Sequence, residues 1–198
     1  VATDDERIVA EVQSFGGNVV LTGSHHQSGT DRCFEAYTLF NEPCDFIINI
    51  QGDEPFIQPD QIDLLAGMLD GLTEIATLSK SITSQEQLFN PNVVKVVMND
   101  MMEALYFSRS PIPHIRNTPE KDWLSKHTFY KHIGMYAYRS DILERLTRLS
   151  VSSLEKAESL EQLRWLENGF KIRVAETTTE THGIDTPEDL QKIIQSLK

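Results

Sequence analysis

A short apolar run that ends in an acidic turn constrains the fold more than any other stretch of this sequence. Residues 46–50 read Phe-Ile-Ile-Asn-Ile and stop abruptly at Gln51-Gly52-Asp53-Glu54-Pro55. Continuous apolar runs of this length are typical of strands buried on both faces, as in parallel sheets. Ligands of open α/β sheets bind at the carboxyl ends of such strands, so Asp53 and Glu54 would stand where a metal or a phosphate sits. Glycine, aspartate and proline are equally favoured in surface turns, so the stretch alone leaves both interpretations open.

Helical and strand-like segments alternate on both sides of this run. Apolar residues follow helical spacing between residues 8 and 15, where Thr3 or Asp4 could cap the helix, and again from Pro59 to residue 69. Short strands are predicted at 19–21, 75–78 and 172–175, and one continuous helix at 154–166. This alternation predicts a layered α/β sheet rather than a helical bundle or a sandwich.

The middle of the chain follows a different pattern. Strands are predicted at 93–98, 104–107 and 133–138 with few helices between them, and a loop rich in proline, histidine and arginine separates the last two. We expect one domain over residues 1–198, in which approximately 99–150 form an antiparallel inserted lobe. Such a lobe would carry substrate contacts or a subunit interface.

The net charge of −12 argues against a nucleic-acid partner or an anionic membrane surface, since both need a basic face. No apolar run approaches the roughly 20 residues that cross a bilayer, so we expect no membrane insertion. The two cysteines, Cys33 and Cys44, match no metal spacing or disulfide framework, which favours a reducing cytoplasm. The chain opens on Val1-Ala2-Thr3 without an initiator methionine, like the end of a strand, and we expect an N-terminal piece to be missing.

Two aspartates form the strongest candidate for a metal site. Asp53 and Asp185 each fall in a turn just after a predicted strand, on what would be the same edge of a parallel sheet. Two carboxylates there could hold Mg²⁺, which prefers hard oxygen ligands and keeps waters and substrate phosphates in its other positions. Asp185 could instead cap the next helix, but Thr186 already suits that role.

Other candidate residues are ambiguous when each is taken alone. Ser28 and Arg32 flank a helix start that would favour an anion, although Ser28 or Thr30 is also an ordinary helix cap. Arg109 could clamp a carboxylate or phosphate, or it could be a surface arginine. His132 could bond a sugar hydroxyl or serve as a structural partner. Glu161 and Gln162 lie one turn from a leucine face, where most such pairs are simply solvated.

Seven motifs in order remove much of this ambiguity. The chain resembles the family of 3-deoxy-manno-octulosonate (KDO) cytidylyltransferases from Val1 to the C-terminus. The motifs that carry the resemblance are HQSGTDR at 26–32, IQGDEP at 50–55, FNPNVVKVV at 89–97, ALYFSR at 104–109, HIGMY at 132–136, LEQLR at 160–164 and GIDTPED at 183–189.

The resemblance implies a fold, a reaction and a set of site residues. The fold would be a Rossmann-like nucleotidyltransferase (GT-A-like) mixed sheet flanked by helices, with a smaller α+β dimerisation lobe. The reaction would transfer CMP from CTP to KDO with Mg²⁺ as cofactor, in a homodimer. The carried-over roles are metal binding and catalysis for Asp53 and Asp185; nucleotide binding for Ser28, Arg32, Gln51 and Gly52; and KDO binding for Arg109, His132, Tyr136, Glu161 and Gln162.

The resemblance also implies a departure from the family pattern. In that family a glycine-rich phosphate loop sits before the point at which this chain begins, so a unit of roughly 30 or more residues would be absent. Either that piece exists and was left out of this sequence, or this polypeptide cannot bind CTP properly, and we expect the fragment by itself to be inactive. Two other functions stay open. One is a related sugar-acid cytidylyltransferase of the CMP-sialate type. The other is a non-catalytic, truncated dimer partner, against which the retention of Asp53, Asp185 and Arg109 counts.

Overall fold

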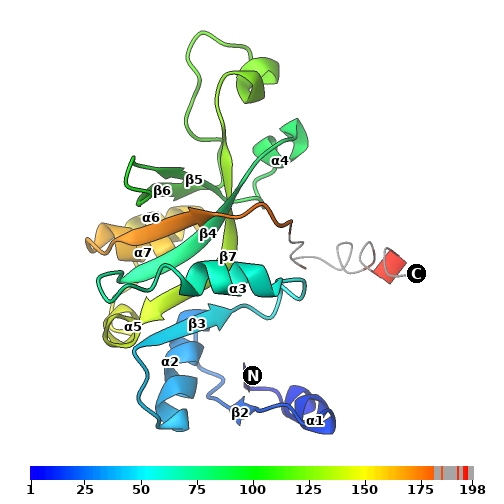
Figure 1. Cartoon of the computed structure of the whole chain (residues 1–198), viewed down its shortest axis with the longest axis vertical. Helices are drawn as coiled ribbons and strands as arrows, with labels where there is room; N and C mark the ends of the chain where they lie inside the picture. Colours follow the sequence, from blue (N-terminus) through cyan, green and yellow to red (C-terminus); the bar gives the residue numbers. More distant parts are fainter. Residues whose placement is uncertain (181–183, 185–190, 192–193, 196–198) are drawn as a thin grey trace.

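The computed structural model describes residues 1–180, 184, 191 and 194–195 (Figure 1). Its strands are β1 Ala2–Thr3, β2 Val20–Leu21, β3 Phe46–Ile50, β4 Ile75–Ser81, β5 Lys95–Met98, β6 Ala104–Ser108, β7 Tyr130–Arg139 and β8 Ile172–Glu176. Its helices are α1 Glu6–Ser14, α2 Gly29–Phe40, α3 Pro59–Ala66, α4 Gln85–Phe89, the 3₁₀ helix η1 Glu120–Ser125, α5 Ser140–Thr147, α6 Ser153–Glu158 and α7 Gln162–Glu167. No helix in the described ranges is long and apolar enough to span a membrane.

The long strand β7 is the centre of a six-stranded mixed sheet. It pairs antiparallel with β3, β4 and β5, while β6 continues the sheet beyond β5 and β8 pairs parallel with β4. The predicted α/β class with a mixed sheet is therefore confirmed. Because β3 and β4 both oppose β7, and β8 follows β4, the three strands β3, β4 and β8 run in the same direction. Their carboxyl ends consequently point toward the same side of the sheet.

The prediction for β3 itself was wrong in one respect. Among the described strands β3 pairs only with β7, and that pairing is antiparallel, from Phe46 opposite Arg139 to Ile50 opposite Met135. Residues 46–49 are partly buried and Ile50 is exposed. The apolar run thus marks a partly buried strand that borders a cavity, rather than a strand of a parallel sheet that is buried on both faces.

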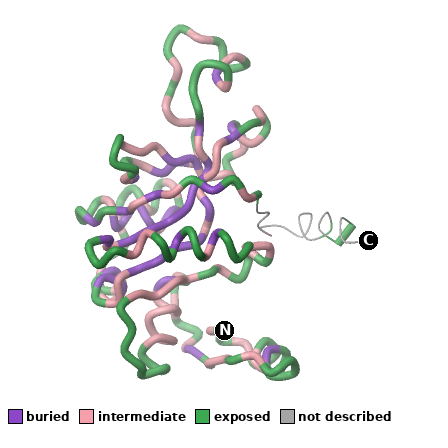
Figure 2. The backbone as a smooth tube through the Cα atoms, viewed as in Figure 1, coloured by how far each residue is buried: buried purple, intermediate pink, exposed green. Residues whose placement is uncertain are grey.

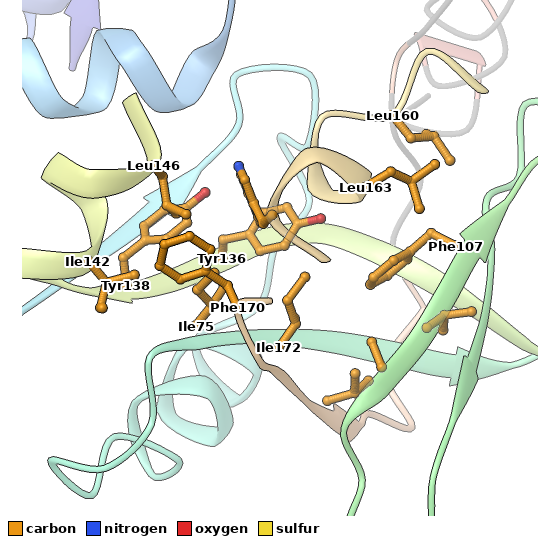
Figure 3. Packing of buried hydrophobic residues seen from close by; sticks show 14 of the residues in the cluster. Ile75, Phe107, Tyr136, Tyr138, Ile142, Leu146, Leu160, Leu163, Phe170 and Ile172 are labelled. Atoms are coloured by element: carbon orange, nitrogen blue, oxygen red, sulfur yellow. The ribbon is translucent and has the colours of Figure 1, made fainter. Parts of the chain in front are cut away.

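Helices cover both faces of the large sheet (Figures 1 and 2). On one face Leu65 of α3 packs with Leu78 and Met135. On the other face α5 and α7 pack on the strands, and α2 joins them through Cys33 and Phe34. Figure 3 shows the core of this second face, in which the labelled residues are Ile75, Phe107, Tyr136, Tyr138, Ile142, Leu146, Leu160, Leu163, Phe170 and Ile172.

A separate two-stranded sheet begins the chain. β1 and β2 are parallel, with Ala2 opposite Val20, in agreement with the strand-like opening predicted from the sequence. The helix between them, α1, begins one residue later than expected. Asp5 caps it, because its carboxylate accepts a hydrogen bond from the backbone N–H of Arg7 at 2.8 Å.

The range 99–150 does not stand apart as a unit in this fold. It contains β7, the central strand of the large sheet, and α5, whose Ile142 and Leu143 lie in the main core. Residues 110–129 alone project from the sheet, at the top of Figure 1, on a small cluster that includes Trp123 and Phe129. A substrate or dimerisation role for this projecting arm stays a prediction.

The leucine-rich stretch 154–166 was predicted as one helix, and this was wrong. Ser159 has a φ of 52°, in the left-handed region, and it separates α6 from α7. Ser152 and Glu155 form a capping box that starts α6. The break places Glu161 at the N-cap of α7, where its carboxylate contacts Thr30 of α2.

Candidate active site

A cavity of about 990 Å³ opens between the start of α2, the end of β3 and the start of α7. It brings together the five residues Arg32, Gln51, Gly52, Asp53 and Glu161, to which the resemblance assigned roles, and Glu54 of the acidic turn also lines it. The remaining lining residues are Val1, Ala2, Gly29, Thr30, Cys33, Ala36, Ile48, Asn49, Ile50, Pro55, Ile57 and Ile62. A cavity of this size, at the carboxyl end of a strand, is large enough for a small-molecule ligand.

The acidic turn forms one wall of this cavity. The N–H of Glu54 donates to the carbonyl of Gln51 at 3.1 Å, which closes the turn, and Asp53 is exposed. The backbone N–H of Ile184 donates to the carbonyl of Asp53 at 2.8 Å. This bond brings the segment after β8 against the turn after β3, as expected for two strands that run in the same direction. Asp185, the predicted second aspartate, lies outside the described residues.

The donor chemistry of the turn fits a magnesium ion. Within the described ranges no three His, Cys, Asp or Glu residues gather as a metal cluster. Mg²⁺ does not need such a cage, because it usually binds one or two carboxylates and completes its shell with waters and substrate phosphates. The exposed carboxylate of Asp53, on the wall of an open cavity, is a donor of that kind.

The start of α2 forms the opposite wall. Ser28 is the helix cap, since its hydroxyl accepts from the N–H of Asp31 at 3.1 Å, and the ordinary capping interpretation is therefore confirmed. Arg32 donates to the hydroxyl of Thr22 at 2.7 Å and pairs with Asp4 at 3.2 Å. These contacts hold its guanidinium between the small sheet and the cavity.

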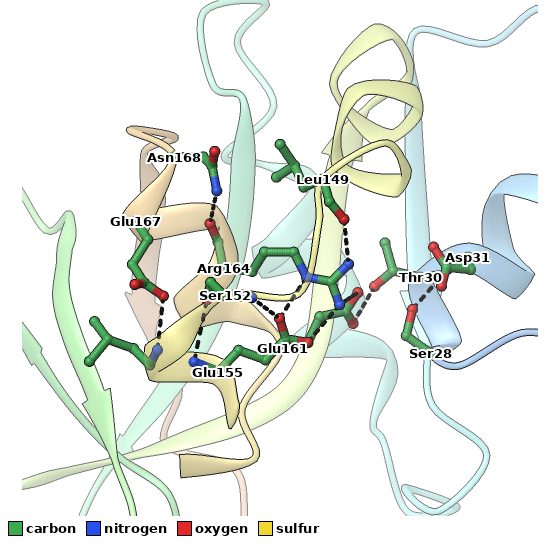
Figure 4. A network of polar contacts seen from close by, with 11 residues as sticks. Ser28, Thr30, Asp31, Leu149, Ser152, Glu155, Glu161, Arg164, Glu167 and Asn168 are labelled. Carbon is green, nitrogen blue, oxygen red and sulfur yellow. Dashed lines mark hydrogen bonds and ion pairs between the residues drawn. The ribbon is translucent and has the colours of Figure 1, made fainter. Parts of the chain in front are cut away.

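Glu161 closes the cavity from the side of α7 (Figure 4). The hydroxyl of Thr30 donates to its Oε2 at 2.8 Å, and its Oε1 lies 3.8 Å from the guanidinium of Arg164. Burial raises the pKa of the Glu161 carboxyl, while hydrogen bonds from Thr30 and Ser28 and the charge of Arg164 act in the opposite direction. The carboxylate is therefore held by α2 more closely than by its own helix.

Arg109 does not line the cavity. Its three guanidinium nitrogens donate to the backbone carbonyls of Glu158 at 2.7 Å, Pro91 at 3.1 Å and Ser159 at 3.3 Å. The guanidinium thereby satisfies carbonyls at the end of α6, a common role for a cation at a helix C-terminus. An arginine has five N–H donors, so two remain for a ligand.

His132, Tyr136 and Gln162 are likewise absent from the cavity lining. His132 lies on β7 with its Nε2 2.9 Å from the hydroxyl of Thr77 and its ring edge-on to Phe107. Tyr136 is 4% exposed and packs edge-on to Trp165, and its hydroxyl has no hydrogen-bond partner among the described residues. Gln162 is buried at the start of α7. Of these candidate sugar-side residues, His132 and Tyr136 thus lie on β7 and Gln162 lies on α7.

The titration of His132 predicts a pH dependence of stability. Burial lowers the pKa of His132 from its ordinary value of 6.5 to about 3. Between these values the unfolded chain binds a proton that the folded protein does not, so the free energy of unfolding falls as the pH falls from 6.5 toward 3. The slope from this residue is at most about 1.4 kcal/mol per pH unit. Urea unfolding at a series of pH values would measure it.

The matched comparison for this prediction uses two variants. His132→Gln should show a flatter stability profile than the unaltered protein between pH 3 and 6.5. His127→Gln, at an exposed position of the projecting arm, should keep the original slope. Equal slopes in all three proteins would mean that His132 is not held neutral by the fold.

Two buried residues with hydrogen bonds to candidate site residues, Thr30 and Lys95, received no functional role in the sequence analysis. Thr30 was considered only as a cap, and the structure instead directs its hydroxyl to Glu161. Lys95 was quoted within a motif but given no role. It is fully buried, and its ammonium donates to the carbonyls of Asn90, Val93 and Arg109 at 3.0, 2.6 and 2.5 Å. A lysine amid β-branched residues is an unusual strand pattern, and this was the available signal.

Comparison with known proteins identifies the family of this chain. The sequence model of the family described as "Cytidylyltransferase" matches residues 1–172. The 3-deoxy-manno-octulosonate cytidylyltransferase of Cytophaga hutchinsonii is 63% identical over 194 residues, which cover 98% of this chain and 78% of that protein. The enzyme of the same name from Parabacteroides distasonis is 57% identical and covers 100% of this chain and 80% of that protein.

Of two solved structures compared with this chain, one supports the same family and the other shows only the fold. A CMP:2-keto-3-deoxy-manno-octonic acid synthetase complexed with CTP superposes with a TM-score of 0.88 at 43% identity, over 100% of this chain and 79% of that one. The inositol-1-phosphate CTP transferase from T. maritima has a TM-score of 0.64 at 15% identity, over 98% of this chain and 72% of that one, and shows only a shared fold. The chain therefore belongs to the cytidylyltransferase family, and within it to the 3-deoxy-manno-octulosonate cytidylyltransferases.

Proposed function

We propose that this protein transfers CMP from CTP to the 2-hydroxyl of KDO and releases pyrophosphate. The observation that carries the proposal is the cavity, which joins an exposed carboxylate, Asp53, to the start of α2 and to Glu161 on a family-matched scaffold. The related structure at 43% identity is described as complexed with CTP. High identity to enzymes named for KDO favours this substrate over sialic acid and over a non-catalytic role.

In this reaction the protein mainly has to position CTP and KDO and to neutralise the charge of the phosphates. The sugar hydroxyl attacks the α-phosphate while pyrophosphate leaves in line, so no covalent intermediate with the protein is required. We propose that Asp53 and Asp185 hold Mg²⁺. When bound, this ion would neutralise phosphate charge and lower the pKa of the attacking hydroxyl.

The nucleotide is assigned to the α2 side of the cavity. Unpaired backbone N–H groups at the start of a helix favour anions, and Gly29 and Thr30 bring that helix start to the cavity wall. Arg32 adds a cation that two neighbours hold in place. Gln51 and Gly52 present the turn after β3 to the same space.

The sugar acid is assigned to the α7 side. Glu161 lines the cavity and can accept hydrogen bonds from sugar hydroxyls. We propose that four further residues contribute to the same sugar-acid subsite: Arg109, His132, Tyr136 and Gln162. Arg109 would use the two N–H groups that do not donate to backbone carbonyls. The homodimer and the cytoplasmic location stay proposals that rest on the family resemblance.

Removing the Glu161 carboxylate should weaken the use of KDO more than the use of CTP. In the full-length protein Glu161→Ala is expected to raise the KM for KDO on the order of tenfold or more, since a hydrogen bond to a charged group is lost. The KM for CTP should change less than about twofold. Steady-state kinetics with each substrate varied in turn would measure both, and His132→Ala should show the same preference.

A matched control is available on α4. Glu86 is exposed and does not line the cavity, so Glu86→Ala should leave both KM values unchanged. If Glu161→Ala altered only the KM for CTP, the nucleotide and sugar ends of the cavity would be reversed.

A further inference from the structure

One hydrogen bond joins the two ends of this cavity directly. The Thr30 hydroxyl, on the second residue of α2, donates to Oε2 of Glu161 at 2.8 Å, across 131 residues of sequence (Figure 4). Thr30 is 3% exposed, so its hydroxyl is shielded from competing water. Both residues line the cavity, Thr30 from the proposed nucleotide side and Glu161 from the proposed sugar side.

The cationic neighbour of this carboxylate is engaged elsewhere. Arg164 lies 3.8 Å from Oε1 of Glu161, but its guanidinium donates to both oxygens of Glu155 at 2.8 and 2.6 Å and to the carbonyl of Leu149 at 3.2 Å. A charge-assisted hydrogen bond at 2.8 Å constrains a carboxylate more tightly than an ion pair at 3.8 Å. Thr30 thus constrains Glu161 more tightly than Arg164 does, and the Ser28 hydroxyl acts on the carboxyl in the same direction as Thr30.

We propose that Thr30 is a positioning residue whose hydroxyl holds the Glu161 carboxylate in the cavity, where it can receive the sugar acid. This inference rests on the proposed function. Without the hydroxyl, Glu161 loses its closest partner, and the pull of Arg164 draws the carboxylate back toward α7. A glutamate has several rotatable bonds, so the geometry of the subsite would be lost without any change of backbone.

Two substitutions at this position separate positioning from packing. Thr30→Val keeps the branched shape and removes the hydroxyl, while Thr30→Ser keeps the hydroxyl and removes a methyl group. In the full-length protein, Thr30→Val should raise the KM for KDO on the order of tenfold and leave the KM for CTP within about twofold. Thr30→Ser should stay within about twofold of the unaltered enzyme for both substrates, because it keeps the hydrogen bond.

A double-substitution cycle shows whether Thr30 acts through Glu161. In a Glu161→Ala background, Thr30→Val should have no further effect on the KM for KDO, because the group that it positions is gone. If the two effects instead multiply, Thr30 acts by another route and the proposal fails. An equal rise in the KM for CTP, or a loss of activity in Thr30→Ser, would also overturn it.

A readout independent of catalysis keeps this test distinct from the proposed function. A hydrogen bond to the ionised carboxylate lowers its pKa, so Thr30→Val should raise the pKa of Glu161 in a carbon-13 NMR titration, whereas Thr30→Ser should not. Ser28, Arg164 and Asp31 also act on this carboxyl, and all three are unchanged in the two variants. If the unaltered enzyme makes no CMP-KDO, the proposed function fails, and this titration still decides whether Thr30 holds Glu161. If the enzyme makes CMP-KDO and the titration shows no shift, only the Thr30 proposal fails.

Discussion

Replacing Asp53 by asparagine in the full-length protein is expected to lower kcat for CMP transfer by roughly 10²- to 10³-fold. The amide keeps the size of the side chain and removes the negative charge that we propose holds Mg²⁺. Asp53 is exposed on the cavity wall, and its contact with Ile184 is made by a backbone carbonyl that the substitution leaves intact. The thermal midpoint should therefore change little, since exposed substitutions are usually worth less than about 0.5 kcal/mol.

The control for this experiment is an aspartate on the neighbouring helix. Asp63 of α3 is exposed and does not line the cavity, so Asp63→Asn should retain full activity. Differential scanning fluorimetry would verify that both variants are folded. Near-normal magnesium-dependent turnover in Asp53→Asn would remove Asp53 from the metal site.

Replacing Lys95 by methionine is expected to destabilise the fold by about 3 kcal/mol. The substitution keeps the apolar stem and deletes the ammonium, so the carbonyls of Asn90, Val93 and Arg109 lose their donor. For a chain of this size the loss corresponds to a fall of the thermal midpoint by about 6–12 °C. Thermal unfolding followed by circular dichroism would measure it.

The same ammonium supports the surroundings of Arg109. Ser108 and the backbone N–H of Arg109 donate to the carboxylate of Glu158 at 2.7 and 2.9 Å, beside the carbonyl that Lys95 holds. Lys126→Met is the matched control, because Lys126 is exposed, and its midpoint should stay within about 2 °C of the unaltered protein. If the midpoint of Lys95→Met changed as little as that of Lys126→Met, the three carbonyls would have found other donors.

The sequence predicted elements better than it predicted their partners. The strands at 75–78, 104–107 and 172–175 were recognised because their apolar character is local, and all three are present with slightly different ends. The partner of β3 depends on how β7 crosses the whole sheet, and no local pattern in residues 46–50 encodes this. The break at Ser159 was hidden because leucines continue at helical spacing through it.

The candidate site was predicted only in part, because local sequence features identify residues but not their tertiary contacts. The turn containing Asp53 was found from a strand end and a cluster of acids, and the structure places it with Glu161 at one cavity. Arg109 and His132 were identified by residue type, whereas their packing partners are set by tertiary contacts with α6 and β4. Thr30 was overlooked because a threonine at a helix start is an ordinary cap. Lys95 was overlooked because its role depends on the carbonyls that surround its ammonium in the fold.

The most direct test of the central claim is product formation by the full-length protein from CTP and a sugar acid, followed by phosphorus NMR. We expect CMP-KDO and pyrophosphate to form with KDO and Mg²⁺, and much less product to form with sialic acid. No product should form after EDTA removes the metal, and product formation should return when Mg²⁺ is restored. Product formation that prefers sialic acid, or that proceeds unchanged in EDTA, would contradict the account.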